Sequence, residues 1–236
     1  MMQRLLSVVS VMVIMVMLLA GCSAPVGGGK ANSSSQVTET ASVSTPESSS
    51  AVSSDESSST AKELTRGKVE GNTYINSYAD FIFKAPENWV YASDKEIAEM
   101  MGVGLESFAG PASDFAKALV QNKAVYDMLA LDSNTGSSVT VMYQKLTLTA
   151  GGALFSEDEF LQASKIAFAA SQSSYTFGDF KDETVSGDSY RVLTAELSEQ
   201  GLKQYIYARK MDKYMLSFIV TVCGDDDITK IMGNFA

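Results

Sequence analysis

The side chains of this 236-residue sequence that could do chemistry are chiefly carboxylates, because the chain contains no histidine. Ser-His-Asp and Cys-His nucleophiles therefore cannot form within it. Three polar clusters remain: two of them could hold a hard cation such as calcium, and two converging carboxylates could cleave a glycosidic bond. The clusters are Asp225-Asp226-Asp227, Glu157-Asp158-Glu159, and Asp132-Ser133-Asn134-Thr135-Gly136.

Each cluster also has a purely structural interpretation. The first two precede apolar residues at helical spacing, and acids in a first helical turn contribute about 0.3–1 kcal/mol each. The third lacks the glycine and the glutamate that a calcium loop needs at its sixth and twelfth positions, which are Ser137 and Tyr143 here. We therefore expect helix caps and a hairpin turn, with no metal and no cofactor.

A different kind of chemistry is indicated at Tyr205, Tyr207 and Arg209. These residues alternate along one predicted strand, so their side chains share a face, and Tyr190 on a neighbouring strand can lie beside them. Tyrosine and arginine are enriched at the centres of protein contacts. The three residues are thus candidates for binding a protein or a glycan, and the alternative is that helices cover them as part of the core.

The two cysteines have different settings. Cys223 follows the apolar run 216–222 and is expected to be a buried or strand-end residue, with no second folded thiol for a disulfide. Cys22 ends a leader with Arg4, an apolar run over 5–19, and the tetrapeptide Leu19-Ala20-Gly21-Cys22. This layout is typical of a secretory signal whose last four residues look like a bacterial lipobox, in which the cysteine receives diacylglycerol before cleavage.

These features predict a lipoprotein signal peptide over residues 1–21, with an uncleaved membrane anchor as the alternative. The apolar run is shorter than the roughly 20 residues that span a bilayer. Residues 22–65 would then form a lipidated, disordered tether, because 17 of the 28 residues from Ser33 to Thr60 are serine or threonine. The domain would be held on the extracytoplasmic face of the bacterial membrane.

Residues 66–236 are expected to form a single globular domain, because all 22 aromatic residues lie between Tyr74 and Phe235. The net charge of −10 and the lack of a basic stripe argue against a nucleic-acid partner.

Capping boxes at Ser93 to Glu96 and Ser156 to Glu159 predict helix starts. Further helices are expected near 113–119 and after 227, and strands near 74–78, 81–83, 125–131, 139–146, 190–197, 204–211 and 214–222.

The last predicted strand is apolar at nearly every position, which indicates that it is covered on both faces. Hairpin-length connections make the sheet antiparallel. Because predicted helices flank the strands in sequence, the pattern favours an α+β fold of the α/β/α sandwich type, with a central antiparallel sheet and helices on both faces.

The opening of the folded part, Asn72-x-Tyr74-x-Asn76-x-Tyr78-x-x-Phe81-x-Phe83-x-x-Pro86-x-x-Trp89, resembles the start of the PsbP-like fold, named after an extrinsic subunit of photosystem II. It is especially similar to small lipoproteins of Gram-positive, clostridial-type bacteria. The resemblance implies an α/β/α sandwich and a role in binding or assembling other proteins. It supplies no site residue.

The function expected from these observations is that of a non-catalytic binding or assembly module, attached to the membrane through diacylglycerol on Cys22, with an envelope protein or glycan as partner. A carboxylate-dependent envelope hydrolase and a small solute-binding lipoprotein are the alternatives.

Overall fold

The computed structural model describes residues 63–102, 105, 124–146, 154–170 and 174–236. The predicted signal peptide, the tether up to residue 62 and the predicted helix near 113–119 lie outside these residues. Within the described part, Leu64 is already buried. Contacts with the core therefore include the residues just before Arg66.

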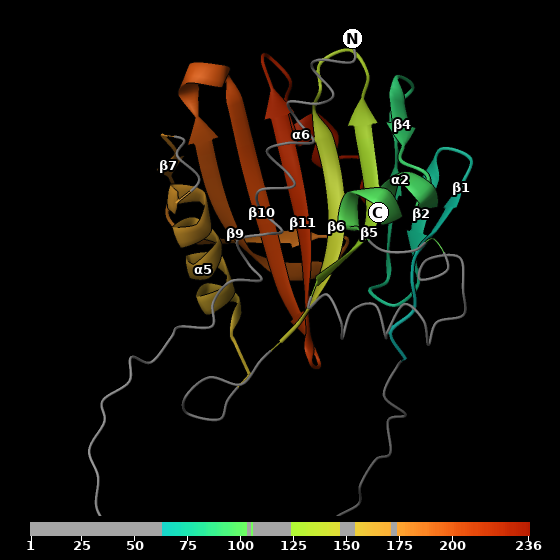
Figure 1. Cartoon of the computed structure of the whole chain (residues 1–236), viewed down its shortest axis with the longest axis horizontal. Coiled ribbons are helices and arrows are strands. Elements are labelled where there is room, and N and C mark those ends of the chain that lie inside the picture. Colours follow the sequence, from blue (N-terminus) through green and yellow to red (C-terminus); the bar gives the residue numbers. More distant parts are fainter. Residues whose placement is uncertain (1–62, 103–104, 106–123, 147–153, 171–173) are drawn as a thin grey trace, which may run out of the picture. The chain divides into compact units, whose positions relative to one another are not determined.

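An eight-stranded sheet forms the centre of the described part (Figure 1). Its strands pair antiparallel, in the spatial order β4-β5-β6-β11-β10-β9-β7, and β8 also pairs with β9. The strands are β4 (Trp89–Tyr91), β5 (Ala124–Asp132), β6 (Ser138–Lys145), β7 (Thr176–Phe177), β8 (Lys181–Val185), β9 (Asp188–Leu197), β10 (Leu202–Met211) and β11 (Tyr214–Cys223). The antiparallel sheet predicted from the sequence is confirmed.

Strand β11 lies at the middle of this sheet, between β6 and β10. Every residue from Tyr214 to Val222 is buried, as a sequence that is apolar at nearly every position predicts. A tight hairpin joins it to β10, and Asp212 in that turn has a positive φ of 51°. The connection between β9 and β10 contains the short 3-10 helix η1 (Ser198–Gln200).

Helix α5 (Glu157–Ala170) packs against β9 and β10 on one face of the sheet (Figure 1). It begins with the predicted capping box, in which Ser156 Oγ accepts from the Glu159 N–H and the Glu159 carboxylate accepts from the Ser156 N–H. Helix α2 (Asp94–Met101) begins with the same arrangement at Ser93 and Glu96, and packs beside β5. Both predicted helix starts are confirmed.

A small antiparallel sheet and a short helix lie over the opposite face. The sheet consists of β1 (Lys68–Glu70), β2 (Thr73–Asn76) and β3 (Phe81–Lys84), and the helix is α6 (Ile228–Met232). The rings of Phe81 and Phe235 each contact Phe218 of β11, with centroid distances of 4.8 and 5.2 Å. These aromatic contacts join the small sheet and the C-terminal segment to the large sheet.

The described part is mostly antiparallel sheet with few helices. The strands near 125–131, 139–146, 190–197, 204–211 and 214–222 agree with prediction to within two residues at each end. Strands β1, β4, β7 and β8 were not predicted; they have two to five residues each, too few to show an alternating pattern. On the face opposite α5, the small sheet of β1, β2 and β3 and the helix α6 cover the large sheet. No helix among the described residues has the length and apolar character to cross a membrane.

Candidate functional site

The register of β9 and β10 gathers the residues that we call the tyrosine–arginine patch: Tyr190, Tyr205, Tyr207 and Arg209. Tyr205 lies opposite Thr194 and Tyr207 opposite Val192, so the patch occupies one face of two adjacent strands. The rings of Tyr190 and Tyr207 meet edge to face at a centroid distance of 6.5 Å. The shared face and the neighbouring Tyr190 are as the alternation predicts.

Tyr207 is buried, with 1% of its surface exposed. Its hydroxyl donates to Glu183 Oε2 on β8 at 2.7 Å, and the Lys181 ammonium lies 2.5 Å from the other oxygen of that carboxylate. Burial raises the pKa of Tyr207. Burial also acts to raise the pKa of Glu183, but the hydrogen bonds from Lys181 and Tyr207 outweigh it and lower that pKa. Tyr207 is therefore a neutral donor that fixes an ionised carboxylate.

Arg209 is held from two sides. Its guanidinium pairs with Asp188 and lies 5.8 Å from the centre of the Tyr190 ring, a cation–π geometry. The side chain keeps 26% of its surface exposed. Tyr205 is half-buried. The part of the patch that a partner could touch thus consists of Tyr205 and the outer edge of Arg209, with Tyr190 and Tyr207 buried as their support.

This arrangement suits contact better than catalysis. Arg209 and Lys181 each pair with a carboxylate of the same face, so their charges are fixed in position. A guanidinium that is held in place loses less conformational freedom when it binds, which favours recognition of a polar partner. Glu183, as an ionised carboxylate that already accepts two hydrogen bonds, is poorly placed to act as a general base.

Sequence reasoning missed a second polar centre, at Asp127 on β5. The pairing of β5 with β6 shifts by one residue between Tyr126 and Met128, so Asp127 is the additional residue of a β-bulge. Bulges turn a side chain away from the regular alternation. Here the bulge directs a carboxylate into the interior, where its side chain has no exposed surface.

Four donors surround this carboxylate. The Tyr74 hydroxyl donates at 2.5 Å, the Gly67 N–H at 3.0 Å and Asn76 Nδ2 at 3.3 Å, while the Arg66 guanidinium lies 3.3 Å away. Burial raises the pKa of Asp127, and the donors oppose that shift. Three donors come from residues 66–74, so the carboxylate attaches the start of the domain to β5 of the large sheet.

The signal for this centre was a single aspartate within the apolar run 124–131. A buried carboxylate needs hydrogen-bond partners, so an isolated acid in a strand indicates a polar network. The network encloses Asp127 and occupies its carboxylate with hydrogen bonds. It is a structural feature rather than a site open to substrate.

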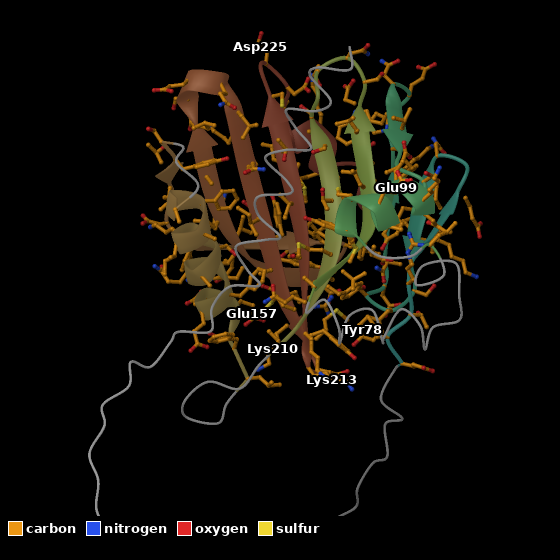
Figure 2. The ribbon with its side chains drawn as sticks, viewed as in Figure 1. Tyr78, Glu99, Glu157, Lys210, Lys213 and Asp225 are labelled. Carbon is orange, nitrogen blue, oxygen red and sulfur yellow. The ribbon has the colours of Figure 1, made fainter. Side chains whose placement is uncertain are left out.

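The acidic clusters take the structural roles expected of them. Asp227 caps α6 by accepting from the Thr229 N–H at 2.9 Å. Asp132 accepts from the Asn134 N–H at 2.7 Å in the turn between β5 and β6. Glu157 lies in the first turn of α5 and also accepts from the backbone N–H of Lys210 at 2.8 Å, as their positions in Figure 2 illustrate.

Two further acids of these clusters, Asp158 and Asp226, contact other elements. Asp158 pairs with Arg191 of β9 at 2.6 Å, which attaches α5 to the sheet. Asp226 accepts from Ser137 Oγ at 2.5 Å. Within the residues that the structure describes, no group of three or more Cys, Asp and Glu side chains could hold a metal ion.

Cys223 ends β11 and is half-buried. Burial raises the pKa of its thiol, and the nearby Asp226 adds to that effect. A raised pKa keeps the thiol protonated and unreactive at neutral pH. Cys22, the predicted lipidation residue, lies outside the described residues.

No protein-family model matches the chain, and no curated protein matches its sequence. Among solved structures, the chain is similar to the solution structure of cyanobacterial PsbP (CyanoP) from Synechocystis sp. PCC 6803. The TM-score is 0.41 and the identity 12%, over 73% of this chain and 93% of that chain.

Proposed function

We propose that this chain is a bacterial lipoprotein, of the Gram-positive type, whose folded part is a non-catalytic binding or assembly module on the extracytoplasmic face of the membrane. Diacylglycerol on Cys22 would hold it there, and residues 22–65 would be the tether. Two acyl chains suffice for a stable anchor, since each buried CH₂ contributes about 0.8 kcal/mol. The proposal includes an α/β/α sandwich with helices on both faces of the large sheet.

The observation that carries the binding role is the fixed geometry of the tyrosine–arginine patch. Arg209 is held by Asp188 and by the Tyr190 ring, yet a quarter of its side chain reaches solvent. Tyr205 lies on the same face of β10. A half-buried tyrosine beside a fixed arginine is the composition of a contact centre for a protein or a polar glycan.

Membrane attachment is tested by the mature mass of the chain purified from a Gram-positive host. We expect a polypeptide that begins at Cys22 and carries a diacylglycerol adduct, whereas Cys22→Ala leaves the leader uncleaved. A mature chain that retains Met1 with Cys22 unmodified would contradict the anchor.

The contact surface is tested by site-specific photocrosslinking in the same host. A benzoylphenylalanine at position 205 is expected to yield a discrete crosslinked product. The matched control places it at position 210, an exposed residue of the same strand whose side chain points to the opposite face. Equal crosslinking from both positions, or none from 205, would exclude the patch as the contact surface.

A further inference from the structure

Strand β1 is an open edge of the small sheet. In the order β1-β2-β3 it pairs with β2 on one side, and no other strand among the described residues pairs with it (Figure 1). All three of its residues, Lys68, Val69 and Glu70, are exposed. A strand at the edge of a sheet presents backbone N–H and C=O groups that can pair with another chain. The outer side of β1 is therefore available to a further strand.

The two charged residues of β1 form no ion pair within the part of the chain that the structure describes. Lys68 lies opposite Ile75 of β2, and no charge faces it there. Glu70 lies opposite Thr73. Because residues two apart on a strand point to the same side, the lysine and the glutamate lie on one face of the small sheet. They are free to pair with charges on a neighbouring strand.

Strand β8, which pairs only with β9 among the described strands, differs in this respect. Its Lys181 pairs with Glu183 of the same strand at 2.5 Å. Its Asp182 pairs with Arg191 of β9 at 3.3 Å. The charges of β8 are thus satisfied within one chain, whereas those of β1 are not.

The sequence of β1 is complementary to itself when two copies run antiparallel. With a two-fold axis at Val69, the Lys68 of each copy lies opposite the Glu70 of the other, and opposite charges directly across an antiparallel pair stabilise it. A parallel pair in register would instead place like charges side by side. Val69 is 47% exposed, so the antiparallel pairing also removes apolar surface from water.

Charges on an edge strand commonly prevent it from pairing with other sheets. Lys68 and Glu70 have this effect on a strand that lacks matching charges, but an antiparallel second copy of β1 carries the charges that match. From the open edge, the unpaired charges and the self-complementary sequence, we propose that β1 pairs antiparallel with β1 of a second copy of this chain. The two small sheets then form one continuous sheet across the two-fold axis.

The contact is small. Stable interfaces bury roughly 1,200–2,000 Å², which an edge of three residues does not supply, so the pairing is weak in dilute solution. Confinement to a membrane raises the effective concentration of neighbouring chains and favours weak contacts between them. In this respect the pairing rests on the membrane attachment proposed above.

The test is cysteine crosslinking of the full chain in intact cells of a Gram-positive host, with the short, membrane-permeable reagent bismaleimidoethane. In the antiparallel pair the two Cα atoms at position 69 lie about 5 Å apart. Val69→Cys is therefore expected to give a crosslinked product of twice the mass of the chain. The chain without an added cysteine gives the background.

The matched control is Ile82→Cys. Ile82 is also exposed, at 38%, but it lies on β3. In the proposed pair, five strand spacings separate the two copies of β3, which places these residues about 24 Å apart. Ile82→Cys is therefore expected to give no product above background.

Exchange of charges between copies distinguishes self-pairing from other contacts at this edge. In the Val69→Cys chain, Lys68→Glu alone and Glu70→Lys alone each place like charges opposite one another, and each should lower the yield by about fivefold or more. When the two variants are produced together with different tags, the mixed pair has opposite charges at both places. The mixed product should therefore recover the yield of Val69→Cys alone.

The proposal is overturned if Val69→Cys gives no product of twice the chain's mass, if Ile82→Cys gives as much, or if the crosslinked product contains a different protein. It is also overturned if either charge variant alone crosslinks as well as the mixture. The mature-mass measurement separates this result from the membrane anchor. A chain that carries diacylglycerol on Cys22 but gives no product at position 69 retains the anchor and lacks the pairing.

Discussion

Replacing Asp127 by alanine provides the sharpest test of how the domain is held together. The substitution deprives two buried donors of their acceptor, the Tyr74 hydroxyl at 2.5 Å and the Gly67 N–H at 3.0 Å. Each unsatisfied buried donor costs about 1–3 kcal/mol. We therefore expect Asp127→Ala to lower the free energy of unfolding at pH 7 by roughly 2–6 kcal/mol, against a total of about 5–15 kcal/mol for a typical domain.

The assay is urea unfolding of the full chain, followed by the fluorescence of Trp89. With a urea dependence of about 2 kcal/mol per molar, the midpoint should fall by roughly 1–3 M. The slope of the transition should stay the same, because the apolar core is unchanged. A variant that is unfolded without urea would agree with the upper end of this range.

The matched control is Asp94→Ala, because Asp94 pairs with the same arginine. The Arg66 guanidinium lies 2.8 Å from Asp94, whose side chain is 49% exposed, and 3.3 Å from Asp127, which has no exposed surface. An exposed ion pair is worth about 0–1 kcal/mol, so the control should change the midpoint by less than about 0.5 M. Equal midpoints for the two variants would refute the assignment of Asp127 as the buried attachment point.

Three further results are expected. Gly67→Ala should destabilise the chain strongly in the same urea assay, because a β-carbon there would lie 2.5 Å from the buried hydroxyl of Tyr74. The control Gly178→Ala should be tolerated, because the nearest atom to its β-carbon, in Thr194, is 3.6 Å away. Tyr207→Phe should raise the pKa of Glu183, measured by NMR titration, because one of the hydrogen bonds that lower this pKa is lost; an unchanged pKa would count against that bond. Asp127→Asn should lower the free energy of unfolding most at acidic pH. Burial raises the pKa of Asp127 in the folded state above its value of about 3.9 in the unfolded chain. The neutral form therefore contributes its full stability below a pH of about 3.9, and this contribution is lost as the pH rises through the folded-state pKa. A cost that grows between pH 4 and 7 would be inconsistent with a raised pKa.

Local sequence patterns predicted the elements that are long enough to display them. The ten-residue strands β9, β10 and β11 and the capping boxes at Ser93 and Ser156 follow directly from alternation and from spacing. The structural roles of the acids at 132 and 227 were also correctly predicted, since each satisfies backbone donors next to its own position. These features depend on contacts within a few residues.

Local sequence patterns do not predict contacts between distant segments of the chain. The shared face of Tyr205, Tyr207 and Arg209 was predictable from alternation, but the burial of Tyr207 depends on β8, whose five residues include three charged ones and show no apolar period. The role of Asp127 depends on a bulge, and one additional residue in a strand leaves no mark in the sequence.

The bulge at Asp127 means that β5 contains one residue more than its ladder with β6 requires. Removing that residue would join Tyr126 directly to Met128 and make the pairing continuous, so the two strands could keep their partners on either side of the deletion. The chain would lose a carboxylate and retain its sheet. A single-codon deletion could therefore release residues 66–74 from β5 without altering the order of the strands in the sheet. The attachment of the N-terminal segment and the architecture of the sheet would then be independent of each other.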